Sequence, residues 1–255
     1  MSKPRQSPQL LIFAITMFFA LPTALHAQVK VLMSGGFSAA YQELLPEFQN
    51  TTGIAVSTAR GASQGDGPNT IGAQLRRGVP ADVVIMSRGG LTELMAEGRI
   101  AVGSDVDLAR VPLGVCVRAG TPRPDISTID AFRQTLLRAK SIGSQSSSTI
   151  YMTTKLFPQL GIASAMTGKL SDAGPAGASG EVEIVIAPVS EILPVPGADF
   201  VGTIPAEIQF VQVFAAALVK GTKEPEASKR LIAFLASERA TAAIEKTGMK
   251  RPALR

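Results

Sequence analysis

Short β-rich segments alternate with helical patterns from residue 29 to residue 98, and this order limits the chain to one class of fold. The β-rich segments lie at 29–33, 54–58 and 82–86. Between the first two, apolar residues recur at helical spacing from Tyr41 to Phe48. Strands that alternate with helices predict an α/β fold with a mostly parallel sheet and helices on both faces.

The first helix is predicted to have Ser38 as its N-cap and Gly53 as its C-cap. The alternation of strands and helices returns in the second half of the chain. Further strands are predicted at 111–117, 141–143, 182–186 and 210–219, helices at 129–137 and 149–156, and a closing helix pair that begins at Pro225. Crossovers near 108–112 and 203–210 predict a lobe made of 28–109 plus 207–255 that encloses a second lobe, 110–206.

The first 27 residues have the order of a secretory signal peptide. Lys3 and Arg5 precede an apolar run from Leu10 to Leu21, and small residues continue to Ala27. This run is shorter than the roughly 20 residues of a membrane span. We expect cleavage after Ala27, location in the periplasm and no membrane anchor. The formal net charge of +5 contains those two basic residues, so only +3 remains and no nucleic-acid partner is expected.

Catalysis that needs histidine is excluded for the mature chain. The only histidine, His26, belongs to the predicted signal peptide. A Ser-His-Asp triad and a His-bearing zinc site therefore cannot form. Cys116 is the only cysteine, and its apolar surroundings predict a buried structural thiol. We expect neither a metal nor another cofactor.

Four loops rich in glycine and serine follow predicted strands, at the edge where open α/β sheets bind ligands. Small hydroxyls and free N–H groups at the start of a helix bind anions, and the planar fork of arginine matches a carboxylate. One such loop alone is more often only a helix cap or turn. The candidate ligand-binding residues are Ser34, Gly36, Phe37, Ser38, Arg60, Ser63, Ser87, Arg88, Ser146, Ser147, Ser148 and Thr149.

The chain resembles the periplasmic molybdate-binding protein family over essentially its whole mature length. The resemblance is carried by the segments 31–36 (VLMSGG), 78–85 (GVPADVVI), 190–197 (SEILPVPG) and 233–237 (AFLAS). It implies the class II periplasmic binding fold, in which two α/β lobes with two crossover strands enclose a central cleft. It also implies a monomeric solute-binding protein that delivers a small anion to an ABC permease.

The chain differs from this family at positions that would bind the ligand. Members that hold molybdate use a tyrosine after a late strand, and that position falls near Ala187 or Pro188 here. Arg60 and Arg88 have no counterpart in the largely uncharged pocket of that family. We therefore expect an organic di- or tricarboxylate rather than molybdate.

An enzymatic alternative remains open, because periplasmic aconitate isomerases resemble the same family. Their reaction shifts a double bond by an allylic proton transfer, which needs carboxylate-binding groups and one positioned base. We favour a binding protein over this isomerase. The candidate bases are Tyr151, Lys155, Glu191 and Glu207.

Overall fold

The computed structural model describes residues 27–252. In chain order the strands are β1 (Gln28–Met33), β2 (Ala55–Arg60), β3 (Val83–Ser87), β4 (Val106–Arg118), β5 (Ile142–Gly143), β6 (Leu170–Ser171), β7 (Ile184–Pro188), β8 (Ala198–Thr203) and β9 (Val211–Leu218). The α-helices are α1 (Ser38–Thr52), α2 (Ile71–Arg76), α3 (Arg88–Ala96), α4 (Ile129–Arg138), α5 (Ser146–Tyr151), α6 (Phe157–Gln159), α7 (Val189–Ile192), α8 (Pro225–Ala236) and α9 (Thr241–Lys246). Short helical turns include η1 (Gly35–Phe37), the π-helical η2 (Met152–Leu156) and η5 (Ala206–Ile208).

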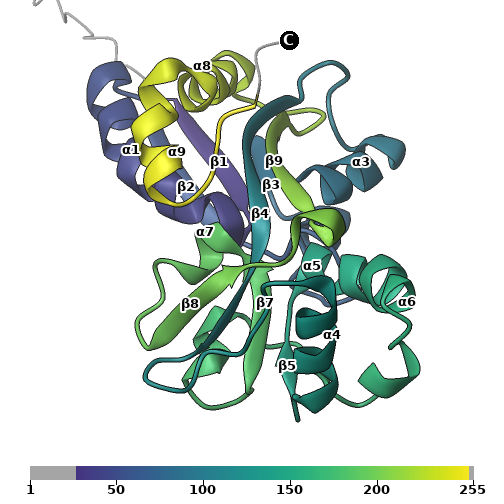
Figure 1. The fold of residues 1–255 in the computed structure, drawn as a ribbon. Coiled ribbons are helices and arrows are strands. Elements are labelled where there is room, and N and C mark those ends of the chain that lie inside the picture. Colours follow the sequence, from purple (N-terminus) through teal and green to yellow (C-terminus); the bar gives the residue numbers. More distant parts are fainter. Residues whose placement is uncertain (1–26, 253–255) are drawn as a thin grey trace, which may run out of the picture.

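The long strand β4 belongs to two sheets. Up to Pro112 it pairs antiparallel with β9, and from Leu113 onward it pairs antiparallel with β7 and β8. The first sheet has the order β2-β1-β3-β9-β4, and the second continues from β4 through β7, β5 and β6. We call the parts of the chain around these sheets lobe 1 and lobe 2. Figure 1 shows β4 running from the upper lobe 1 into the lower lobe 2.

Each lobe buries apolar side chains on both faces of its sheet. On β9, Phe214, Ala216 and Leu218 pack in the cluster that includes α1, α8 and α9, whereas Ala215 and Ala217 pack toward α2 and α3. This follows from the two-residue alternation of a strand. Lobe 2 likewise has one cluster under α4 and α6, and a second that contains the free, fully buried Cys116.

Most predicted elements are present, with differences at the starts of two helices and with further elements, such as β6 and α7, that the sequence did not predict. Ser38 is the first residue of α1 and makes no cap, because η1 leads directly into the helix and Phe37 takes the N-cap position. The helix predicted at 149–156 begins at Ser146 and widens into the π-helical turn η2. Strand β8 is a further element that the apolar pattern does not predict, since its residues are only partly buried. Gly53 ends α1 in the left-handed region, as predicted.

A glutamine amide holds the chain where it returns from lobe 2 to lobe 1. Gln209 accepts a hydrogen bond from the Leu113 N–H at 2.8 Å and donates to the carbonyls of Leu113 and Ile204, each at 3.1 Å. The Tyr151 hydroxyl donates to the Ile208 carbonyl at 2.7 Å. The crossover is therefore fixed to both β4 and α5, close to the boundaries predicted near 108–112 and 203–210.

Apart from Ala27, the predicted signal peptide lies outside the described residues. Among the helices within 27–252, none combines the length and the apolar character that crossing a membrane requires.

Candidate functional site

Hydrogen bonds join the two lobes where loops at the ends of β2 and β3 meet α5. Ser87 Oγ lies 2.8 Å from Ser147 Oγ, and the Ser147 hydroxyl donates to Gln64 Oε1 at 2.6 Å. The Gln64 N–H donates to Ser146 Oγ at 3.0 Å. We call Gln64, Ser87, Ser146 and Ser147 the interlobe latch. Ser146 takes φ = 54°, a strained conformation for a residue with a side chain, and strain of this kind clusters at functional sites.

The lobe 1 side of the latch is fixed from behind. Ser63 Oγ accepts a hydrogen bond from the Ser87 N–H at 2.9 Å, and Ser87 Oγ caps α3 by accepting from the Gly90 N–H at 3.3 Å. A side chain at Gly90 would meet the Ser63 carbonyl at 2.2 Å, so glycine is required for this close approach. The predicted residues Ser63 and Ser87 therefore have protein partners already.

A second group of hydroxyls has no partner. Ser34 follows β1, Ser144 follows β5, Thr149 lies on α5 and Ser190 follows β7. Their oxygens are buried, and none makes a hydrogen bond within residues 27–252. We call these four residues the unpaired hydroxyls. Because a buried hydroxyl without a partner costs about 1–3 kcal/mol, four of them in the loops and helices that follow β1, β5 and β7 indicate an unmet binding function.

Glu191 lies on α7, next to Ser190 in the chain, and faces the residue after Ser34. Its Oε1 is 3.4 Å from the position that a Cβ on Gly35 would occupy, so the carboxyl of lobe 2 faces the loop after β1 of lobe 1. Burial raises the pKa of Glu191 to about 7. The group can therefore hold or release a proton near neutral pH.

The two predicted arginines lie in different surroundings. Arg88 donates to Asp105 at 2.6 Å and to Asp107 through two nitrogens. Burial lowers the pKa of Arg88, but the hydrogen bonds that it donates to Asp107 and Asp105 outweigh this effect and raise the pKa overall. Arg60 is exposed at the end of β2, and its charge acts on the Tyr41 hydroxyl, whose pKa is raised by burial.

The other predicted ligand-binding residues divide between the core and the interlobe boundary. Phe37 is fully buried in the core of lobe 1, so its ring is unavailable to a ligand. A side chain at Gly36 would meet the ring of Phe214 at 1.9 Å. Ser38 is half-buried at the start of α1, and Ser148 is buried on α5.

The remaining candidate bases are less suited than Glu191. Tyr151 uses its hydroxyl on the Ile208 carbonyl and stacks its ring on Phe210, with the ring centroids 4.7 Å apart. Lys155 is exposed on η2 and Glu207 is exposed on η5. Burial raises the pKa of Tyr151, which makes its hydroxyl a weaker acid.

Three polar residues at the boundary between the lobes were not predicted from the sequence. Gln64 lies in a predicted loop, but its side chain carried no signal that it would reach lobe 2. Ser144 is the first residue after β5, as Ser34 is after β1, and this shared position is a signal that could have found it. Ser190 lies one residue further from its strand, within α7.

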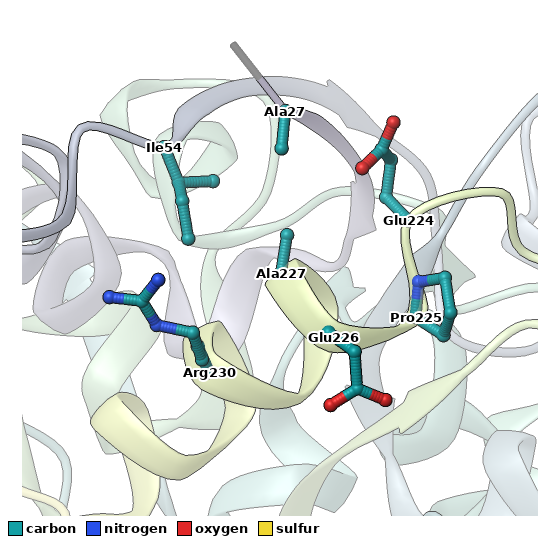
Figure 2. A pocket seen from close by; sticks show the side chains of 7 residues that line it. All are labelled: Ala27, Ile54, Glu224, Pro225, Glu226, Ala227 and Arg230. Carbon is teal, nitrogen blue, oxygen red and sulfur yellow. The ribbon is translucent and has the colours of Figure 1, made fainter. Parts of the chain in front are cut away.

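A metal site and a second anion site have less support. Within residues 27–252, no cluster of three or more His, Cys, Asp or Glu side chains could hold a metal ion. A pocket of about 300 Å³ lies at the opposite end of β1 from Ser34 and contains Glu224, Glu226 and Arg230 (Figure 2). Its two carboxylates against one guanidinium disfavour an anion.

Comparison with known proteins gives one family and one close relative. Residues 29–250 match the family described as bacterial extracellular solute-binding protein. The chain is 39% identical over 228 residues to an aconitate isomerase from Pseudomonas sp., covering 87% of each chain.

Solved structures show the same fold at lower identity. A periplasmic molybdate-binding protein from Azotobacter vinelandii superposes with a TM-score of 0.69 at 22% identity, covering 88% of this chain and 99% of that one. The sulfate-binding protein SubI from Mycobacterium tuberculosis gives a TM-score of 0.68 at 18% identity, covering 89% and 88%. The two lobes joined through β4 thus have the fold of periplasmic binding proteins.

Proposed function

The chain belongs to the bacterial extracellular solute-binding protein family, and on that premise we propose that it binds a small polycarboxylate between its lobes and interconverts the cis and trans isomers of aconitate. The observation that carries the proposal is the set of unpaired hydroxyls on both lobes, with the Glu191 carboxyl beside them. Hydroxyls bind carboxylate oxygens, and a carboxyl near its pKa transfers protons.

A polycarboxylate is favoured over an inorganic oxyanion by two features. Ala187 and Pro188, at the position where molybdate-holding members have a tyrosine, are apolar and end a fully buried strand. Arg60 is exposed, has no acidic partner among residues 27–252 and can meet a carboxylate, whereas Arg88 binds Asp105 and Asp107. We therefore assign the ligand-facing charge to Arg60 and a supporting role to Arg88.

The identity of the relative supports turnover rather than binding alone. At 39% identity over most of both chains, the Pseudomonas protein shares much more sequence with this chain than do the binding proteins of known structure. That relative is an aconitate isomerase, and we infer the reaction from it. We place the protein in the periplasm, as a monomer that needs neither a metal nor another cofactor.

A receptor for an ABC-type importer is the second candidate function. It is favoured by the fold, since the molybdate- and sulfate-binding proteins superpose over nearly the whole described chain. A receptor would hold the same polycarboxylate without changing it and pass it to a permease.

One experiment distinguishes the isomerase from the receptor. The mature protein, residues 28–255, is incubated with cis-aconitate and, separately, with trans-aconitate, and both are followed by proton NMR in D₂O. An isomerase brings both samples to the same mixture and exchanges the methylene protons for deuterium. A thermal-shift titration on the same protein reports binding, because a ligand at 100 times its Kd stabilises by about 2.7 kcal/mol.

The outcomes are distinct. Conversion from both sides supports the isomerase. A thermal shift without conversion supports the receptor and removes the enzyme. A shift with molybdate and none with any carboxylate removes the polycarboxylate altogether.

A further inference from the structure

Glu191 is the carboxyl at the interlobe boundary that no other group neutralises. No hydrogen bond or ion pair joins its oxygens to another side chain in the described part of the molecule, and its pKa is raised by burial alone. The elements packed against α7 are η1, β4, β7 and β8. The charged residues on these elements and on the segment after Gly248 are Asp107, Arg110, Arg118, Asp199, Lys250 and Arg251.

Both aspartates have partners of their own, and burial is the cause of the raised pKa of Glu191. Asp107 binds Arg88, and Asp199 accepts a hydrogen bond from the Gly120 N–H at 3.1 Å. Neither η1 nor β7 contains a charged residue. The Glu191 carboxyl is therefore not a member of a structural ion pair, which is the usual reason for a partly buried glutamate.

The surroundings of Glu191 supply hydrogen-bond donors that also lack partners. Ser190 precedes it in the chain, and Ser34 precedes Gly35, the residue that Glu191 faces. These two hydroxyls can hold the carboxylates of a substrate while the Glu191 carboxyl meets its carbon chain.

We propose that Glu191 is the catalytic residue that carries the proton in the isomerisation, with Ser34 and Ser190 holding the substrate carboxylates. The inference rests on the proposed function and narrows it to one acid-base group. Of the four candidate bases, Glu191 alone combines burial, freedom from a partner and a position facing the opposite lobe.

The reaction balances without a further reactant. The Glu191 carboxylate removes a proton from the methylene carbon of aconitate, and the C–H electron pair forms a new double bond to the central carbon. The electron pair of the old double bond moves to the former vinylic carbon, and this carbon takes the proton back from the Glu191 carboxylic acid. The methylene and vinylic carbons exchange places, so the geometry about the double bond is set anew and the molecular formula is unchanged.

The variant Glu191→Gln tests the inference. The amide keeps the size and the polarity of the side chain but cannot accept the proton, so kcat should fall by at least about 100-fold. The midpoint of the thermal-shift titration with trans-aconitate should stay within about threefold of the wild-type value. Glu245→Gln, an exposed glutamate on α9, is the matched control and should keep full activity.

A second measurement does not depend on any variant. For wild-type protein, kcat/KM for trans-aconitate should rise with pH and level off above about 7, where Glu191 becomes the carboxylate. A profile that is flat from pH 5 to pH 8 overturns the inference.

Failure of the inference is distinguishable from failure of the proposed function. If wild type and Glu245→Gln convert aconitate and Glu191→Gln does so equally well, Glu191 is not the base and the isomerase stands. If wild type converts neither isomer, the proposed function fails and the inference falls with it.

Discussion

The interlobe latch and the unpaired hydroxyls lie at the same boundary between the lobes, yet they satisfy their polar groups in opposite ways. In the latch, Gln64, Ser87 and Ser147 bond to one another across the boundary. Ser34 and Ser190 reach no acceptor or donor within the described chain. The latch therefore needs nothing added to hold the lobes together, whereas the second group is complete only when something else supplies the hydrogen bonds.

The difference has a free-energy counterpart. A typical paired hydroxyl contributes about 0.5–1.5 kcal/mol to folding, while a buried hydroxyl without a partner costs about 1–3 kcal/mol. The same substitution should therefore change stability with opposite sign in the two regions. The predictions below use that contrast, beginning with the largest expected effect.

Glu191→Gln should remove the pH dependence of stability that the Glu191 carboxyl causes. Between pH 4.5 and about 7, the folded protein holds a proton on Glu191 that the unfolded chain has lost, so the free energy of unfolding falls as the pH rises through this window. At pH 8 the variant should be more stable than wild type by up to about 3 kcal/mol. Urea unfolding at pH 4.5, 6 and 8 measures this. Parallel curves for the two proteins would contradict it.

Ser34→Ala and Ser147→Ala should change stability in opposite directions. Removal of the unpaired Ser34 hydroxyl should stabilise the ligand-free protein by about 1 kcal/mol, and loss of the Ser147 latch bonds should destabilise it by about 1 kcal/mol. Ser34→Ala should also weaken polycarboxylate binding about tenfold. Thermal unfolding with and without ligand checks both effects.

Ser228 provides the matched control for this experiment. Its hydroxyl is also fully buried without a partner, but it lies on α8 in the core of lobe 1. Ser228→Ala should stabilise the protein like Ser34→Ala while leaving ligand affinity unchanged. If Ser228→Ala weakens binding equally, unpaired hydroxyls do not mark the ligand site.

Substitution of the two arginines should give the smallest effects, one on stability and the other on ligand affinity. Arg88→Ala leaves Asp105 and Asp107 without their shared cation and should lower stability by about 1 kcal/mol, with ligand affinity unchanged. Arg60→Ala should leave stability unchanged and weaken polycarboxylate binding a few fold. Unfolding and titration of both variants measure the two quantities, and a reversed pattern would exchange their roles.

The sequence was a good guide to the fold because apolar spacing decides it. The fully buried strands β3 and β7 and the amphipathic helices α1 and α8 follow directly from periodicity. Strand β8 was missed because its partly buried residues lack a clean alternation. The N-cap at Ser38 was wrong because a short helical turn before α1 leaves no trace in hydrophobic spacing.

The candidate site was only half predictable. Loops rich in serine could be placed at strand ends, but which hydroxyls remain unpaired depends on contacts between segments far apart in the chain. Arg88 illustrates this limit, since its partners Asp105 and Asp107 lie 17 and 19 residues away. The predicted lobe bounds, 28–109 plus 207–255 and 110–206, stay a prediction that the change of partners along β4 supports.

The hydrogen bond that closes lobe 2 onto itself bears on how such proteins evolve. The Ile204 N–H donates to the Leu113 carbonyl at 3.2 Å, so the chain leaves lobe 2 at the point where it entered. An insert whose two ends are neighbours can be exchanged as one cassette without lengthening either connection. Recombination within the family can therefore pair one half of a binding surface with a different opposite half, and new ligand chemistry can arise without rebuilding the host lobe.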